Sequence, residues 1–189
     1  VIFIANLTLL SAPHAIPEDS YSKKGRPLRK CTVFLAILTY FDRFDRREAL
    51  RRTSLTLEDR VGACHVFYMG SFDKNTVSPE VRKQVEEEMA VHKDIRFVDH
   101  KEEFRLLTFK VVKMFKDAVD NFEFQWLLKT DDDSFVAIDR LYDTIKHEHK
   151  LLYWGRIVRN AKPKRDPGSK YYLSYEEYPR KEFPPYAHG

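Results

Sequence analysis

Residues 126–136 have the sequence WLLKTDDDSFV, in which a short apolar run leads directly into three consecutive aspartates. The apolar residues predict a buried strand, and the aspartates, after which apolar residues soon resume, predict a tight turn at its end. Three adjacent like charges repel one another unless a cation or several hydrogen-bond donors lie close to them. Because Mg²⁺ and Mn²⁺ prefer carboxylate oxygens, Asp131, Asp132 and Asp133 are candidate metal-binding residues.

Aspartates also occur in solvated turns and at the start of helices, so the triplet alone does not define a metal site. An EF-hand is excluded, because the sixth and twelfth positions counted from Asp131 are Val136 and Tyr142 instead of Gly and Glu. The organisation of the surrounding chain therefore decides between the two interpretations.

Upstream of the aspartates, strand-like and helix-like segments alternate. Alternation of this kind is typical of an α/β fold with a mostly parallel sheet, whose ligand crevice lies at the carboxyl ends of the strands. The aspartates follow such a strand end. The predicted strands are 31–40, 62–70 and 94–98. The first two predicted helices are 44–55 and a segment that begins at Ser78-Pro79 and places Val81, Val85 and Met89 on one face. The third is 101–121, with an apolar stripe of Phe104, Leu107, Val111, Met114, Phe115 and Ala118.

Downstream of the aspartates, the spacing of Ile138, Leu141, Tyr142 and Ile145 predicts an amphipathic helix. Residues 151–158, LLYWGRIV, predict a further strand. Beyond Asn160 the chain is polar and rich in proline and tyrosine, and we interpret it as a loop that does not close a domain.

The composition indicates a globular domain, since 189 residues with 43% hydrophobic side chains can bury one core. Thirty-three basic and 29 acidic residues give a formal net charge of +4, which suits phosphate-bearing or anionic saccharide ligands. The basic residues are spread along the chain without a nucleic-acid-binding motif, so we expect no nucleic-acid partner.

The first ten residues, VIFIANLTLL, are apolar but shorter than the roughly twenty that cross a bilayer. They fit either the end of a signal-anchor or signal-peptide segment, or an edge strand or disordered N-terminus. Residues 11–30 have the composition of a flexible linker, and we expect the folded domain over 31–189. Cys31 and Cys64 lie in apolar runs, which favours free core thiols, although a disulfide stays possible in a lumenal chain.

Six motifs in order resemble those of the β-1,3-galactosyltransferase family of Golgi glycosyltransferases. They are RREALRRT at 46–53, VFYMG at 66–70, LTFK at 107–110, KTDDDSFV at 129–136, YWG at 153–155, and a tail with Tyr178-Pro179 and PPYAHG at 184–189. The runs FEFQWLLKTDDDSF and LYWG are most similar to the branch that adds the second galactose of the glycosaminoglycan linkage region. The chain departs from the family pattern at Ser54, where the family has Trp, and at Leu106, where it has Asn.

The resemblance implies a GT-A fold, similar to a Rossmann fold, that binds a UDP-sugar donor through Mn²⁺. It implies Asp133 as a metal ligand, with Asp131 and Asp132 facing the ribose or completing the metal shell through water. Lys129 would lie beside the donor, and Arg47 and Arg51, one turn apart on a helix, would contact its uracil and diphosphate. A single-pass type II Golgi membrane protein with a lumenal catalytic domain is the implied setting, with a glycan on a protein or proteoglycan as the acceptor.

The implied reaction is inverting transfer of a hexosyl group, most simply galactose, to a 3-hydroxyl of a glycan. Such a transfer needs a carboxylate that deprotonates the acceptor hydroxyl. The resemblance places that base after Gly189, so we name no catalytic residue, interpret the chain as an incomplete N-terminal part, and expect no sugar transfer by it. The alternative is a non-catalytic domain that binds a nucleotide or a cation.

Overall fold

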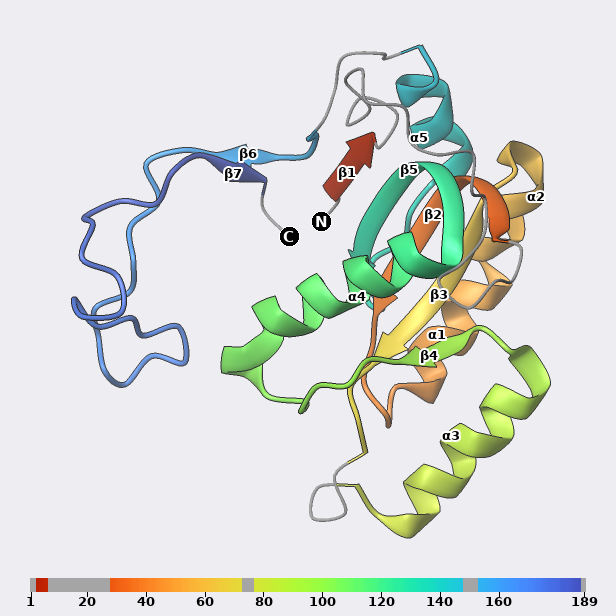
Figure 1. Cartoon of the computed structure of the whole chain (residues 1–189), viewed down its shortest axis with the longest axis horizontal. Helices are drawn as coiled ribbons and strands as arrows, with labels where there is room; N and C mark the ends of the chain where they lie inside the picture. Colours follow the sequence, from red (N-terminus) through yellow and green to blue (C-terminus); the bar gives the residue numbers. More distant parts are fainter. Residues whose placement is uncertain (1–2, 7–27, 73–76, 148–152, 188–189) are drawn as a thin grey trace.

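The computed structural model describes residues 3–6, 28–72, 77–147 and 153–187. Its central sheet has five strands in the spatial order β1-β5-β2-β3-β4 (Figure 1). β2, β3, β4 and β5 run parallel, and β1 pairs antiparallel with β5 at the edge. The predicted α/β fold with a mostly parallel sheet is confirmed. The strands are β1 (Phe3–Asn6), β2 (Arg29–Leu38), β3 (Cys64–Met69), β4 (Ile95–Phe97) and β5 (Phe122–Asp131).

Phe3–Asn6 form the edge strand β1, in which each residue has a register partner in β5. The expectation of a signal-anchor end over residues 1–10 stays a prediction. The other residues of 1–10 and most of the predicted linker at 11–30 lie outside the described residues, and β2 already begins at Arg29. Among the residues that the structure describes, no helix is long and apolar enough to span a membrane.

The predicted helices connect the strands. In α3 the prediction from Ser78-Pro79 is confirmed, because Ser78 Oγ accepts a hydrogen bond from the Val81 amide at 3.3 Å and Pro79 is the first helical residue. The helical segments are α1 (Phe44–Arg52), the 3₁₀ turn η2 (Ser54–Leu57), α2 (Glu58–Val61), α3 (Pro79–His92), the 3₁₀ turn η3 (Phe104–Leu106), α4 (Leu107–Asn121) and α5 (Ile138–Ile145).

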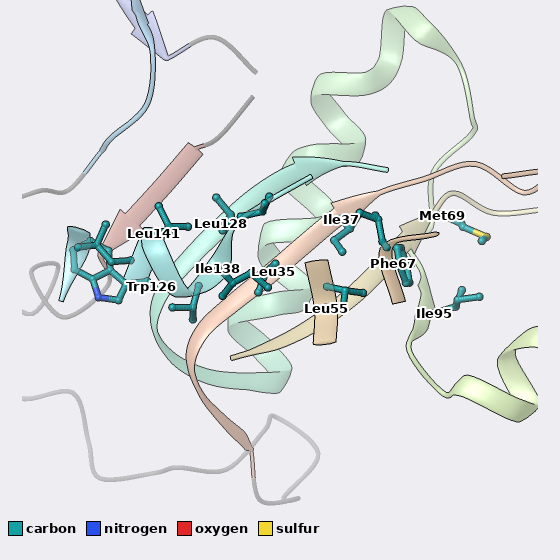
Figure 2. Close-up of a cluster of buried hydrophobic side chains, with 14 of the residues drawn as sticks. Leu35, Ile37, Leu55, Phe67, Met69, Ile95, Trp126, Leu128, Ile138 and Leu141 are labelled. Atoms are coloured by element: carbon teal, nitrogen blue, oxygen red, sulfur yellow. The ribbon is translucent and has the colours of Figure 1, made fainter. Parts of the chain in front are cut away.

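Both faces of the sheet are covered, which explains the nearly continuous apolar sequences of β2 and β3. On one face, Met114 and Ala118 of α4 pack against alternate residues of β2 and β3. α4 crosses this face in Figure 1. On the other face, a larger cluster joins the sheet to the helices before and after the strands, as Figure 2 shows for Leu55, Ile138 and Leu141. Val81 and Met89 are partly buried against this cluster and Val85 is fully buried, as the spacing predicts.

The predicted helix over 101–121 begins later than expected, because a 3₁₀ turn precedes it and the α-helix starts at Leu107. Glu102 stands in the extended segment before the turn, where its carboxylate accepts hydrogen bonds from the Gly70 amide and from Lys110 Nζ, each at 2.5 Å. These bonds hold the segment against the sheet instead of continuing the helix. Phe104 and Leu107, expected on the buried stripe, are 50% and 40% exposed.

The prediction of a strand over 151–158 is correct only at its end. β6 (Ile157–Val158) pairs antiparallel with β7 (Tyr186–Ala187) in a separate two-stranded sheet, while residues 151–152 lie outside the described part of the chain. The intervening residues form an excursion from the body of the domain, drawn in blue in Figure 1. The tail beyond Asn160, interpreted from its composition as a loop, therefore returns to pair with the residues that precede it.

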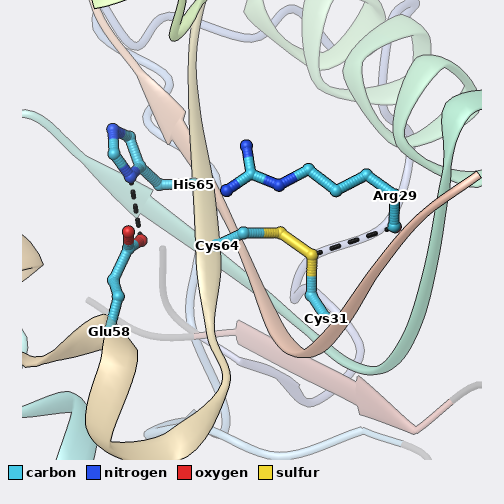
Figure 3. Close-up of a disulfide and its surroundings, with 5 residues drawn as sticks. All are labelled: Arg29, Cys31, Glu58, Cys64 and His65. Atoms are coloured by element: carbon cyan, nitrogen blue, oxygen red, sulfur yellow. Dashed lines mark hydrogen bonds and ion pairs between the residues drawn. A yellow bond between two sulfur atoms is a disulfide. The ribbon is translucent and has the colours of Figure 1, made fainter.

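Cys31 and Cys64 form a disulfide that joins β2 to β3, with the two Cα atoms 5.8 Å apart (Figure 3). The interpretation of both residues as free core thiols is wrong, and the alternative of a disulfide is correct. Apolar surroundings do not distinguish a free thiol from a disulfide, since the bridged residues Cys31 and Cys64 are themselves only 8% and 1% exposed. The adjacent strands decide the pairing, because they bring two cysteines 33 residues apart in sequence side by side.

Candidate donor and metal site

The three aspartates lie at the carboxyl end of β5, beside the end of β2. Leu38, the last residue of β2, is the register partner of Asp131, and the Asp132 amide donates to the Leu38 carbonyl at 3.0 Å. The chain then turns, so that Thr39 and Asp132 face each other, and Thr39 Oγ1 donates to Asp132 Oδ2 at 2.7 Å. The strand-end position expected from the sequence is thus where the structure places the triplet.

The three carboxylates differ in exposure. The Asp132 side chain is only 8% exposed, whereas those of Asp131 and Asp133 are 41% and 63% exposed. Asp132 is therefore an internal member that organises the turn through its hydrogen bonds. Asp131 and Asp133 retain carboxylate oxygens that a ligand can reach.

Arg46 of α1 is the cation closest to the end of the triplet. Its Nη1 lies 3.0 Å from Asp132 Oδ1 and 3.3 Å from Asp133 Oδ2, so one guanidinium bridges two carboxylates. The hydrogen bond to Asp132, followed by the charge of that carboxylate, raises the pKa of Arg46. Sequence reasoning missed Arg46, whose available signal was its position beside Arg47 in the RREALRRT motif.

Lys129 and Asp131 lie at the same strand end, on the face of the sheet that α4 covers. They are two residues apart in β5 and so share the face that Leu127 turns toward α4. Lys129 Nζ donates to Asp131 Oδ1 at 3.0 Å, and its side chain is 10% exposed. The lysine expected beside the donor is thus the partner of one of the candidate metal ligands.

Lys110 is a further buried cation at this edge. Its Nζ donates to the Thr39 carbonyl at 3.0 Å and to Glu102, which ties α4 and the segment before η3 to the end of β2. Burial lowers the pKa of Lys110, although the charge and hydrogen bond of Glu102 oppose that shift. Sequence reasoning missed this role, but a signal existed, since Lys110 is four residues before Met114 and thus interrupts the apolar stripe of α4.

Arg47 and Arg51 lie on one face of α1, as their spacing predicts, but that face turns toward α3 and β4. Arg47 is 0% exposed and donates to Glu88, to Thr39 Oγ1 and to two backbone carbonyls. Arg51 donates to Glu88 at 2.7 Å and to Asp94 at 2.8 Å. Binding of the UDP-sugar by the two arginines stays an untested prediction. The geometry gives it no support, because the guanidinium N–H groups named above already bind protein partners.

Ser54, which departs from the family pattern, has a structural role behind the site. Its Oγ donates to the Val136 carbonyl at 2.6 Å and accepts from the Val136 amide at 3.3 Å. Both bonds are buried, and they fasten the chain that leaves the aspartates to η2. A smaller polar residue at this position thus holds the turn through the backbone.

Comparison with known proteins places this arrangement in a family. A family model described as galactosyltransferase matches residues 45–189, which include all of α1 except its first residue, together with β5 and the aspartates. The chain belongs to the galactosyltransferase family. The resemblance inferred from the six motifs is thereby confirmed at the level of the family, while its glycosaminoglycan-linkage branch stays a prediction.

Individual galactosyltransferases and a related enzyme share between 30% and 32% identity with the chain. Beta-1,3-galactosyltransferase GALT1 of Arabidopsis thaliana is 32% identical over 86% of this chain and 25% of its own length. Beta-1,3-galactosyltransferase 1 of Mus musculus is 32% identical over 94% of this chain and 55% of its own. N-acetyllactosaminide beta-1,3-N-acetylglucosaminyltransferase 2 of Mus musculus is 30% identical over 85% and 42%. The chain thus spans between a quarter and just over half of these relatives.

The carboxylates of this galactosyltransferase-family chain suit a divalent cation of the Mg²⁺ or Mn²⁺ type. Such ions are hard, prefer oxygen, and commonly take one or two protein carboxylates while water and substrate phosphate fill the other positions. Asp131 and Asp133 offer that donor set. Within the described ranges no group of three or more His, Cys, Asp and Glu side chains is arranged to hold a metal by itself, so the remaining ligands would have to come from elsewhere.

Proposed function

We propose that the chain binds a UDP-sugar at the carboxyl end of β2 and β5 and contributes this site to the transfer of a hexosyl group, most simply galactose, to a 3-hydroxyl of a glycan. The observation that carries the proposal is the pair of accessible carboxylates, Asp131 and Asp133, on either side of the buried Asp132. The crevice outside parallel strand ends is the usual ligand site of open α/β sheets.

Asp133 and Asp131 would hold a divalent cation, for which we propose Mn²⁺. When bound, the cation supplies a Lewis acid that stabilises negative charge on the UDP leaving group. The surrounding residues would keep the two carboxylates in place. Arg46 holds Asp133 from the α1 side, and Lys129 holds Asp131 from the α4 side.

The internal residues of the site would fix the turn that carries those ligands. Thr39 links the end of β2 to Asp132, and Lys110 binds the carbonyl of Thr39 from the opposite face. Because the turn is bonded on both faces, it is preorganised before the donor arrives. Preorganisation of this kind reduces the ordering cost of binding.

The cellular setting that we propose is the Golgi lumen, with a single-pass type II anchor and a protein- or proteoglycan-linked glycan as acceptor. The Cys31–Cys64 disulfide supports an oxidising compartment, since such bonds are rare in reducing ones. Family membership supports glycosyl transfer, and relatives named for galactose and for N-acetylglucosamine transfer leave the donor sugar to experiment.

A donor panel tests this function. With Mn²⁺ present, the chain should bind UDP-galactose or UDP-N-acetylglucosamine, and GDP-mannose should bind far more weakly. A transfer assay with galactose-terminated acceptors then separates a donor-binding part, which releases UDP slowly at most, from a complete enzyme. Equal binding of the uridine and guanosine donors would contradict the proposal.

A further inference from the structure

A groove of about 580 Å³ lies between the start of α4 and residues 162–183 of the excursion. Aromatic rings and cations line it together, and none of these residues belongs to the strand-end site. Figure 1 shows the excursion, in blue, beyond the η3 end of α4. The residues that matter here are Phe104, Arg105, Lys162, Lys164, Lys170 and Tyr171.

The two sides of the groove are fastened to each other. Arg105 Nη1 lies 3.3 Å from Glu177 Oε1, and its Nη2 donates to the Tyr172 carbonyl at 3.2 Å. The rings of Phe104 and Tyr171 meet edge to face with centroids 5.3 Å apart. The groove is therefore a joint feature of η3 and the excursion.

The groove has a surplus of positive charge. Arg105, Lys162, Lys164 and Lys170 line it, and Glu177 is its one acidic lining residue. Glu177 is already engaged, because one oxygen binds Arg105 and the other accepts from the Ser174 amide at 2.8 Å. In the part of the chain that the structure describes, exposed Lys162 and Lys164 have no carboxylate within ion-pair distance.

The rings add an apolar surface next to these cations. Phe104 is 50% exposed and Tyr171 is 55% exposed, although each is large and hydrophobic. Lys170 Nζ lies 5.3 Å from the centroid of the Phe104 ring and 4.8 Å from that of Tyr171, so a cation and two rings face the same space. Aromatic faces suit the C–H surface of a pyranose, and ammonium groups suit its anionic substituents.

The groove is connected to the strand-end site through a single short segment. Glu102, two residues before Phe104, binds Lys110, whose ammonium donates to the Thr39 carbonyl at the end of β2. A ligand in the groove would thus lie against a segment that is anchored at the donor site. This arrangement suits an acceptor chain that extends away from the place of transfer.

We propose that the groove binds an anionic saccharide, a chain of pyranose units that carries carboxylate or sulfate groups, and that this chain is the acceptor side of the substrate. The acceptor role depends on the proposed function, whereas saccharide binding does not. Lys162 and Lys164 contact the anionic groups, and Phe104 and Tyr171 contact the sugar faces.

The test uses a chondroitin sulfate hexasaccharide as the probe and neutral maltohexaose as its uncharged counterpart, titrated into the whole chain. The sulfated probe should bind and maltohexaose should not. The double variant Lys162→Gln and Lys164→Gln should bind the probe at least about tenfold more weakly, because two charge-assisted contacts are lost. Lys162→Arg with Lys164→Arg should retain binding.

Two controls complete the experiment. Lys83→Gln with Lys116→Gln removes two exposed lysines from α3 and α4 and should leave saccharide binding unchanged. UDP binding with Mn²⁺ should be the same in the wild type and the Lys162/Lys164 variant. Absence of UDP binding in a wild type that still binds the saccharide would refute the proposed function and not the groove. Unchanged saccharide affinity in that variant, or equal affinity for a six-residue oligouridylate, would overturn the inference.

Discussion

The guanidinium of Arg47 and the carboxylate of Glu88 form a buried ion pair that joins α1 to α3. Arg47 Nε lies 2.9 Å from Glu88 Oε1, and Arg47 Nη2 lies 2.6 Å from Glu88 Oε2, so both prongs of the fork are used. Arg51 shares the same carboxylate and also binds Asp94. Arg47 and Arg51, which the family resemblance assigned to ligand binding, thus belong to a buried network of ion pairs.

Removal of the shared carboxylate should destabilise the fold strongly. Glu88→Ala leaves Arg47 fully buried without its main counter-charge, and breaking a buried pair in this way costs about 3–5 kcal/mol. Urea denaturation measures the change. Glu87→Ala, at the exposed position just before Glu88, should alter the free energy of unfolding by no more than about 0.5 kcal/mol. Similar losses in both variants would contradict a buried network.

His65 should make the stability of the protein depend on pH. Burial lowers the pKa of His65, but its hydrogen bonds to Asp94 and Glu58 and the charges of these carboxylates outweigh burial, so the pKa is raised above its usual value. Figure 3 shows the contact with Glu58. The folded state therefore binds this proton more tightly than the unfolded chain. The stabilisation is complete below the unfolded pKa and is lost as the pH rises through the folded pKa.

Urea midpoints collected upward from pH 6 should consequently show a fall in the free energy of unfolding, by at most about 1.4 kcal/mol per pH unit for one proton. His65→Gln should remove this fall, whereas His92→Gln, at the exposed end of α3, should retain it. A wild-type profile that matches that of His65→Gln would contradict a His65 pKa that is raised by folding.

The alternation of strands and helices was predictable because each element repeats its own hydrophobic period. Ser78-Pro79 marked the start of α3, and the four-residue spacing of Val81, Val85 and Met89 identified its buried face. The strand end at the aspartates was predictable for a related reason, since an abrupt change from apolar to acidic residues coincides with the end of β5. The sequence pattern is therefore sufficient to predict elements that neighbouring residues determine.

The remaining features depend on contacts between distant segments. The disulfide follows from the adjacency of β2 and β3, and the late start of α4 follows from bonds between Glu102, Gly70 and Lys110. The different exposure of Asp132 and its two neighbours arises from Thr39 and Arg46, which precede it by 93 and 86 residues. Helical spacing placed Arg47 and Arg51 on one face, but spacing carries no information on which partner that face meets.

The disulfide should contribute substantially to stability. The entropic model for a crosslink between residues 33 positions apart gives about 3–4 kcal/mol. Cys31→Ala with Cys64→Ala should lower the free energy of unfolding by this order, and reduction of the wild type under denaturing conditions should shift its refolding midpoint in the same direction. If the double variant were as stable as the oxidised protein, the bridge would have no stabilising effect.

The central claim is that Asp133 and Asp131 hold a cation that joins UDP to the strand end, and calorimetric titration of the chain with UDP tests it most directly. Binding should appear with Mn²⁺ and nearly vanish with EDTA. Asp133→Ala should abolish the metal-dependent part, whereas Asp143→Ala, which alters a 69% exposed carboxylate on α5, should leave it intact. UDP affinity that is the same with Mn²⁺ and with EDTA, or that is unaffected by Asp133→Ala, would contradict the claim.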